Sequence, residues 1–372
     1  DVLFSLTVFY AAKKLLNLLG TVVNIRDPGP NEYGDGAAQF PYTGYQAWGA
    51  WLTVGIAVII TGLPYFRAYI DRAFSGDPTG ADAGEILTAR QALAGFIVGF
   101  AALCGIVVAL GAPVWLPVIF LGIYVLIMLA LSRMEAETAV LSPLLAWVSP
   151  QAILTGVAGT AAFSHTELTQ IASLSWFNLD YRAAAMPQQL QAMVALRRAN
   201  VRQLSPLAGV LMLSGAVGIV SCVLFDLQLY YTLGAETPNI NGYRVTMGNV
   251  PWWNLQGWLA QPKPPDAATF GGMAAGSAVT ILLTFLRSRI AGFPLSPAAY
   301  VLSTTWANEA FWFDLFLAWI IKSLTLRYGG IARYRAALPF FLGLILGDFV
   351  TGAAWNLFGA VSGLTLFRTF PN

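Results

Sequence analysis

Apolar residues in this chain gather in long runs that short polar stretches separate. Several runs reach or approach the roughly 20 residues that a helix needs to cross the hydrocarbon core of a membrane. The most regular of them cover residues 92–110, 114–131, 206–231 and 339–359. Further spans are predicted near 2–19, 44–66 and 268–286. The pattern predicts an all-α fold, a polytopic transmembrane helical bundle that forms one membrane domain over residues 1–372.

Two further apolar regions, 138–181 and 292–322, are interrupted by proline and glycine. Each contains the triplet Leu-Ser-Pro, with Ser142 in the first region and Ser296 in the second. Serine is a favourable N-cap and proline suits the first helical position, so each triplet predicts the start of a short helix. Broken helices line substrate sites in transporters, because irregular backbone inside a membrane is tolerated where protein or water satisfies it. Ordinary helix caps at the membrane edge are the alternative interpretation.

Basic residues set the expected orientation of the chain. In an alternating topology, most of the 20 lysines and arginines fall in loops on one side, which is expected to be the cytoplasm. Lys13 and Lys14 interrupt the first span and are assigned to neither side. Both broken regions then begin and end on the cytoplasmic side, so each is either a re-entrant hairpin or a pair of short crossings. The loop predicted at 233–266 lies at the outer interface, where its tryptophans are favoured.

The composition agrees with a membrane protein. Hydrophobic residues make up 57% of the chain and charged residues 10%, whereas soluble domains hold about 25% charged residues. The expected partner of the surface is therefore the lipid bilayer. A net charge of +2 and scattered basic residues exclude nucleic acid as a partner. The chain begins inside an apolar run without a signal peptide, and we interpret it as a fragment that lacks N-terminal spans.

Carboxylates in apolar segments cost about 3 kcal/mol each even at the lower estimate, and they mark functional sites. Asp348 lies in the middle of the last span and must face the interior of the bundle. It is either a structural partner of a neighbouring helix or arginine, or a group that binds substrate or exchanges protons. Glu309 and Asp314 lie in the second broken region at a spacing that puts them on different faces of a helix. At least one of these two acids therefore needs a partner of its own.

Two acids close the span that precedes the first broken region. Glu135 and Glu137 are two positions apart, so their side chains point in different directions. Arg133 and Glu137 are spaced as an i, i+4 pair, which contributes only tenths of a kcal/mol when it is exposed. Both acids are candidates for substrate binding or ion coupling. A solvated helix end is the simpler interpretation.

A polar patch inside the first broken region holds three further candidates, Glu167, Asp180 and Arg182. They are expected either to line a cavity at the cytoplasmic mouth or to form an interfacial loop. His165 is the only histidine, and its distance from Glu167 along the chain is not the spacing of a helical zinc site. The sequence shows no other metal-ligand spacing, no catalytic triad and no phosphate-binding loop. We therefore predict no metal, no other cofactor and no enzymatic activity.

The order of the predicted elements indicates a weak internal repeat. A span, a Leu-Ser-Pro helix, a short helix, a basic stretch and a long span occur within residues 114–232 and again within 268–360. Four Gly-x-x-x-Gly pairs are expected to let neighbouring helices approach closely. They lie at positions 95/99, 272/276, 343/347 and 359/363.

Three stretches carry a resemblance to a known group of proteins. They are SRMEAETA (132–139), SWFNLDYRAAAMPQQLQAMVALRRAN (175–200) and the segment from Gly292 to Trp355. Together they resemble an uncharacterised group of bacterial and archaeal polytopic membrane proteins that is set beside the oligopeptide transporter superfamily. The resemblance implies a many-helix repeat fold in the cytoplasmic (inner) membrane and proton-driven transport of peptides or metal chelates. The Asn-Pro-Gly and Lys-Ile-Pro-Pro-Arg motifs of peptide transporters are absent, which argues against peptides as the substrate.

Two functional hypotheses follow. The first is a secondary transporter, coupled to protons or another cation, that carries a small molecule through a site between the two broken regions. The second is a non-transporting structural or assembly subunit, as part of a homo-oligomer or a larger membrane complex. The second hypothesis requires that the buried acids are fully paired and that no water-filled cavity exists.

Overall fold

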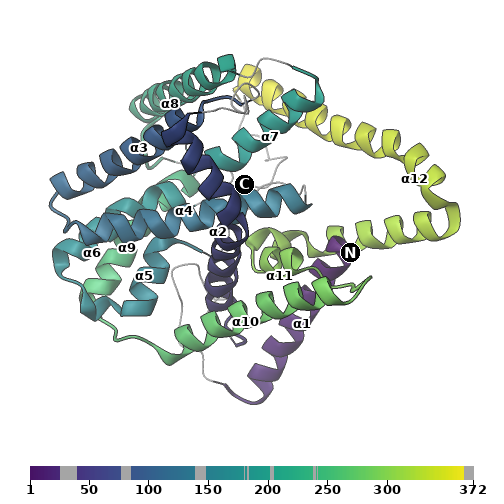
Figure 1. The fold of residues 1–372 in the computed structure, drawn as a ribbon, viewed down its shortest axis with the longest axis horizontal. Helices are drawn as coiled ribbons and strands as arrows, with labels where there is room; N and C mark the ends of the chain where they lie inside the picture. Colours follow the sequence, from purple (N-terminus) through teal and green to yellow (C-terminus); the bar gives the residue numbers. More distant parts are fainter. Residues whose placement is uncertain are drawn as a thin grey trace. The chain divides into compact units, whose positions relative to one another are not determined.

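Figure 1 shows the fold of the chain in a computed structural model, which describes residues 1–25, 40–76, 85–138, 148–179, 181, 184–201, 205–237, 240 and 242–363. Every regular element in these ranges is a helix, as the apolar pattern predicts. The α-helices are α1 (Val2–Val22), α2 (Thr43–Ser75), α3 (Ala89–Ala109), α4 (Trp115–Thr138), α5 (Pro150–Ala158), α6 (His165–Leu174), α7 (Ala185–Arg198), α8 (Ser205–Leu233), α9 (Gly242–Ala260), α10 (Ala267–Arg289), α11 (Pro297–Ser303) and α12 (Trp306–Ser362). Two short 3-10 helices, η2 (Thr160–Ala162) and η3 (Ser175–Asn178), flank α6.

Seven helices in the described ranges are long and apolar enough to cross a membrane, namely α1, α2, α3, α4, α8, α10 and α12. All seven coincide with spans that the apolar runs predict. The chain is therefore organised as a multi-pass membrane protein. The helices divide into two compact units, Asp1–Trp312 and Phe313–Asn372, and the boundary falls inside α12.

Most of α12 forms the second unit, and there it folds back on itself (Figure 1). A straight helix of its 57 residues would be about 85 Å long, well beyond the thickness of a membrane. Gly330 has a φ of +62°, a left-handed conformation that glycine adopts without strain. The Lys322 Nζ atom lies 5.6 Å from the ring centroid of Tyr334, although a straight helix would separate the two residues by about 18 Å. The basic stretch at 327–335 therefore stays helical but reverses the direction of the chain. As a result, α12 consists of two helical segments that are joined at this turn.

The first unit is built on a close contact between α2 and α10. A Cβ atom on Gly276 would lie 2.0 Å from the carbonyl oxygen of Gln46, and one on Gly49 would lie 1.9 Å from that of Met273. Only glycine permits such backbone contact between helices. A Cβ atom on Gly272 would lie 2.5 Å from the Cβ atom of Tyr45 in α2, so the prediction of packing is confirmed for the 272/276 pair. Gly95 and Gly99 have nothing within 4 Å of a built Cβ, and the packing prediction is wrong for that pair within the described structure.

One predicted loop is partly a helix. Residues 233–266 are rich in tryptophan, proline and asparagine, but they contain the 19-residue helix α9. This helix packs against α6 and η3. Pro251 lies inside it, although proline in a helix interior removes one backbone hydrogen bond. Packing against neighbouring helices therefore overrides the low helix propensity of this segment.

Candidate functional site

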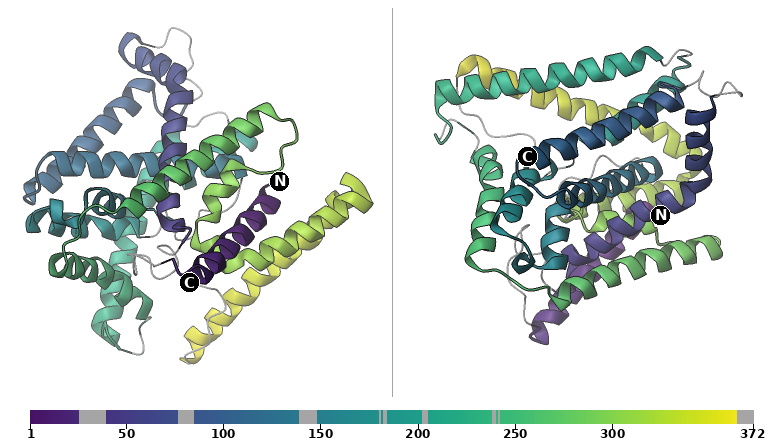
Figure 2. Two further views of the ribbon diagram at one scale, coloured as in Figure 1. Left: turned by 90° about the horizontal axis from the view of Figure 1, so that it is seen from below. Right: turned by 60° about the vertical axis from the view of Figure 1, so that its left-hand side comes forward.

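Short helix α11 enters the first unit alongside α1. At its start, the Ser296 N–H group donates to the Ser5 hydroxyl oxygen at 2.9 Å. One turn further along both helices, the rings of Phe9 and Tyr300 meet edge to face with centroids 5.2 Å apart. The residue numbers rise together in the two helices, so α11 runs parallel to α1. Figure 2 shows α1, α10 and α11 gathered at this place, in agreement with the contacts of α11 with both neighbours.

The chain then reverses at the start of α12. Glu309 accepts hydrogen bonds from Lys13 Nζ at 2.5 Å and from Lys14 Nζ. Next along α12, the Trp312 ring stacks on the Tyr10 ring with centroids 5.1 Å apart. Residue numbers now rise in α12 while they fall in α1, so this part of α12 is antiparallel to α1. Residues 297–312 therefore form a re-entrant hairpin, which is one of the two arrangements predicted for the second broken region.

The tip of this hairpin lies at the middle depth of α1. Helix α1 has 21 residues, or about 31 Å, and Lys13 lies near its midpoint. The break between α11 and α12 is satisfied locally, because the hydroxyl groups of Ser303, Thr304 and Thr305 donate to helix carbonyls at 2.6–2.8 Å. Asn308 is buried at the same break, and its Oδ1 atom accepts no hydrogen bond in the described structure. The hairpin thus brings polar groups to a depth where lipid alone would not satisfy them.

The ion cluster at the tip, formed by Lys13, Lys14 and Glu309, is only partly shielded. The side chain of Lys13 is 11% exposed, that of Lys14 41% and that of Glu309 33%. Two cations face one carboxylate, so the cluster carries one excess positive charge when all three groups are ionised. The sequence identifies Glu309 as an acid that needs a partner but does not identify the two lysines as that partner.

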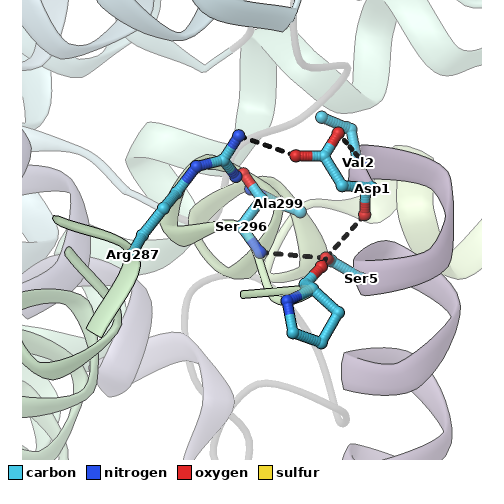
Figure 3. Close-up of polar contacts among 7 residues, drawn as sticks. Asp1, Val2, Ser5, Arg287, Ser296 and Ala299 are labelled. Carbon is cyan, nitrogen blue, oxygen red and sulfur yellow. Dashed lines mark hydrogen bonds and ion pairs between the residues drawn. The ribbon is translucent and has the colours of Figure 1, made fainter. Parts of the chain in front are cut away.

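The base of the hairpin is anchored as predicted for a Ser-Pro helix start (Figure 3). The Ser296 hydroxyl oxygen accepts from the Ala299 N–H group at 3.5 Å, and Pro297 occupies the first turn. Ser5 donates its hydroxyl proton to the Asp1 carbonyl at 2.6 Å while it accepts from Ser296. Arg287 of α10 pairs with the Asp1 carboxylate at 2.6 Å. These bonds occupy the polar groups at the start of α11, so the base of the hairpin is held by α1 and α10.

A cavity of roughly 400 Å³ opens beside the base of the hairpin. An adjoining space of roughly 380 Å³ shares part of its wall and extends to Ser296 and Arg287. The walls come from α2, α4, α10 and α11, and hydroxyl groups are frequent among apolar neighbours. The polar lining consists of Thr53, Thr61, Arg133, Glu137, Thr280, Thr284 and Ser288, and the apolar lining includes Val54, Ile281, Phe285, Pro297 and Ala298.

Arg133 and Glu137 form the charged part of the cavity wall. Their side chains pair at 2.5 Å and are 57% and 38% exposed. An ion pair this open contributes about 0.2–1 kcal/mol, so an incoming ligand can replace either partner at small cost. The i, i+4 spacing predicts this pair correctly.

Glu135 points away from the cavity. It lies about 200° around α4 from Glu137, and it is only 7% exposed. Its Oε1 atom accepts no hydrogen bond from the described part of the chain. The same is true of the hydroxyl group of Ser132, one turn earlier on the same face of the helix. The interpretation of Glu135 as a solvated helix end is therefore wrong, because the helix end is covered by the helices packed around it.

The first broken region reaches the opposite end of the unit. The Lys263 N–H group, just before α10, donates to Thr160 Oγ1 at 2.8 Å. The Gln170 side chain donates to the carbonyl of Leu110, just before α4, at 2.8 Å. Both α4 and α10 end at the cavity, so these contacts lie at the end away from it.

Helix α7 then brings the chain back. Arg197 pairs with Glu85, just before α3, at 3.4 Å. The first broken region lies partly outside the described residues, and its path, either a re-entrant hairpin or a pair of short crossings, stays a prediction. Its described start is a Ser-Pro cap, in which the Ser149 hydroxyl oxygen accepts from the Ala152 N–H group at 3.3 Å and Pro150 follows. This helix start has a serine cap followed by proline, as at Ser296, but the Leu-Ser-Pro triplet does not identify it because valine precedes the serine.

The remaining candidates do not join the cavity. Glu167 completes a capping box at the start of α6, where it accepts from the Ser164 N–H group at 2.8 Å. Asp314 and Asp348 belong to the second unit, and both are exposed. The expectation that Asp348 faces the interior of a bundle is therefore wrong within the described structure. Ser142, Asp180 and Arg182 lie outside the described residues. No three His, Cys, Asp or Glu side chains of the described ranges come together as ligands for a metal ion.

Comparison with known proteins places the chain in a family but supplies no activity. No curated protein and no solved structure matches the chain. The comparisons give no support to the resemblance to oligopeptide transporters or to a bacterial or archaeal origin, which stay predictions. Residues 1–371 match the profile of DUF6785, and the chain belongs to this family of unknown function.

Proposed function

We propose that the chain is a secondary transporter, and that its substrate enters the cavity at the base of the re-entrant hairpin. The observation that carries this proposal is the hairpin itself. It ends at the middle depth of α1, holds an ion cluster at its tip and borders the cavity with its first turn. Broken helices with polar groups at this depth are the usual way in which transporters build a substrate site.

The cavity indicates the kind of substrate. Its volume of roughly 400 Å³ lies in the lower part of the range for small-molecule sites, about 300–1,000 Å³. Hydroxyl groups of Thr53, Thr280 and Thr284 alternate with apolar side chains, and one Arg-Glu pair is available for exchange. We therefore propose a small polar solute that carries a charged group and a short apolar part.

We propose that the ion cluster holds the hairpin tip against α1 in one state of the transport cycle. Glu309 joins the hairpin to α1 through Lys13 and Lys14. Charged groups at this depth are held only while they are paired. A change of charge at any one of them therefore alters how firmly the tip is held, and movement of the tip changes the wall of the cavity.

Thiol labelling tests whether the cavity is open to water. Both native cysteines, Cys104 and Cys222, are replaced by serine, and Thr284→Cys is introduced into the cavity wall. Val220→Cys on α8 is the matched control, because that side chain is 57% exposed on an apolar helix that we expect to face lipid. A membrane-impermeant thiol reagent should label the Thr284 variant from one side of a vesicle and should not label the control. Equal resistance of both variants would contradict a water-filled cavity.

Uptake into proteoliposomes tests transport directly. Protein-containing and protein-free vesicles receive the same mixture of amino acids, short peptides, carboxylic acids and metal chelates, with and without an inward proton gradient. Mass spectrometry of the vesicle contents should show at least one enriched solute. That enrichment should disappear when the Thr284→Cys variant is modified by the thiol reagent. No enrichment of any class in vesicles that contain folded protein would argue against the proposal.

The assembly subunit is the weaker hypothesis. It requires fully paired buried acids and no water-filled cavity. The cavity beside α11 and the lone carboxyl of Glu135 both favour transport instead.

A further inference from the structure

We propose that Glu135 is the proton-binding residue of this protein, so that the ion coupled to transport is a proton. The coupling to transport rests on the proposed function, whereas the protonation of Glu135 rests only on the structure of α4 and its surroundings. Neither the Arg133–Glu137 pair nor the cluster at the hairpin tip has the properties that follow, because the acids in both are matched by cations.

The first argument is burial without a partner. Glu135 is 7% exposed, and its Oε1 atom is buried and accepts no hydrogen bond from the described residues. An ionised carboxylate in such a place would lose its hydration without compensation, which costs several kcal/mol even after relaxation. The neutral acid avoids that cost. Its O–H group can also donate to a neighbouring oxygen, and the unpartnered hydroxyl of Ser132 lies one turn away on the same face of α4.

The second argument concerns the charges around it. Five helices pack against α4, namely α2, α3, α5, α7 and α11. Helix α5 has no titratable residue. Helix α11 has no charged residue. The charged residues of the other three helices are Arg67, Asp71 and Arg72 of α2, Arg90 of α3, and Arg197 and Arg198 of α7. The Arg90 side chain donates to the carbonyl of Ala73 at 3.0 Å, and Arg197 pairs with Glu85. None of these residues forms an ion pair with Glu135 within the described structure.

The third argument is the position of Glu135 relative to the cavity. Helix α4 presents Arg133 and Glu137 to the cavity and Ser132 and Glu135 to the interior. One rigid element therefore joins the ligand-facing wall to the buried acid. If ligand binding displaces the end of α4 beyond Leu126, where α2 contacts its backbone at Gly55, water reaches Glu135, and the carboxyl can release its proton. The step transfers one proton from the carboxyl oxygen to water, and rebinding from water on the other side reverses it.

Infrared spectroscopy measures this proton without any substrate. Near neutral pH, the wild-type protein in lipid should show the carbonyl band of a protonated carboxylic acid. The band should be absent from Glu135→Gln and present in Glu137→Gln, which removes the cation-paired acid of the same helix. Glu135→Asp keeps a carboxyl group and should shift the band rather than remove it, which gives an answer even if the glutamine variant folds poorly. A band that is missing from the wild type, or unchanged in both Glu135 variants, overturns the inference.

Uptake in vesicles then separates this inference from the proposed function. With a transported solute in hand, the ratio of uptake with and without an inward proton gradient should fall to about one in Glu135→Gln. Exchange of labelled for unlabelled solute across the membrane should remain, because it needs no net proton movement. A ratio that stays at the wild-type value, or follows a sodium gradient instead, overturns proton coupling through Glu135. If no solute is transported at all, the proposed function fails while the infrared result still decides whether Glu135 holds a proton.

Discussion

The ion cluster at the hairpin tip yields the sharpest prediction of stability. Glu309→Gln removes the only carboxylate that faces Lys13 and Lys14 in the described structure and leaves both ammonium groups at the middle depth of α1. Lys13 is the more deeply placed of the two, with an exposed side-chain fraction of 11% against 41% for Lys14. The unpaired charge on Lys13 should therefore account for most of the loss.

The magnitude follows from the burial of the partners. Removal of one partner of a fully buried ion pair costs about 3–5 kcal/mol. Glu309 is 33% exposed and Lys14 41%, so solvent reduces that figure, and we expect a loss of about 2–3 kcal/mol in the free energy of unfolding. Lys13→Met should recover most of this loss in the double variant with Glu309→Gln, because it removes the buried unpaired cation. Lys14→Met should recover little.

Thermal or denaturant unfolding in lipid nanodiscs measures these differences. Glu137→Gln is the matched control, since it also removes a carboxylate from an ion pair but at the open cavity wall, where the pair contributes about 0.2–1 kcal/mol. If Glu309→Gln were no less stable than Glu137→Gln, the assignment of the ion cluster to the interior would be refuted. The same holds if both lysine replacements rescued the Glu309 variant equally.

Three further predictions concern the scaffold. Gly276→Leu should lower the free energy of unfolding by about 1–3 kcal/mol or prevent folding, because the new side chain meets the backbone of α2; Gly95→Leu, with open space around it, should unfold like the wild type in the same thermal assay. Glu167→Ala should cost about 1 kcal/mol through the loss of the cap of α6, and an unchanged solute uptake would confirm a purely structural role. Gly330→Ala should cost about 1–2 kcal/mol, because its φ of +62° is strained for any residue with a Cβ atom; unfolding as stable as the wild type would show that the turn in α12 does not depend on this glycine.

The apolar runs predict the spans well because length and hydrophobicity are properties of a single segment. The start of α11 at Ser296 is likewise local, since a serine cap followed by proline is readable without knowledge of the neighbours. The pairing of Arg133 with Glu137 follows from helical spacing alone. These features could be predicted because each is decided within a few residues.

Features that depend on contacts between distant segments could not be predicted. Lys13 and Glu309 are 296 residues apart in the sequence, and the residues around each of them do not predict that the two side chains pair. Glu135 and Glu137 look equivalent at the end of an apolar run, yet neighbouring helices cover one and leave the other open. Helix α9 forms where tryptophan, proline and asparagine predict a loop, because α6 and η3 provide a surface for it.

The backbone contact between α2 and α10 limits which parts of the molecule can act as moving parts. Gly49 and Gly276 leave no room for these two helices to slide past each other or rotate independently. Two of the four cavity walls, α2 and α10, therefore keep a fixed position relative to each other. Gly55 brings α2 close to the backbone of Leu126 in α4 in the same way. Any change in the volume of the cavity therefore falls to α11, which forms the hairpin base, and to the end of α4 beyond Leu126, which carries Glu135.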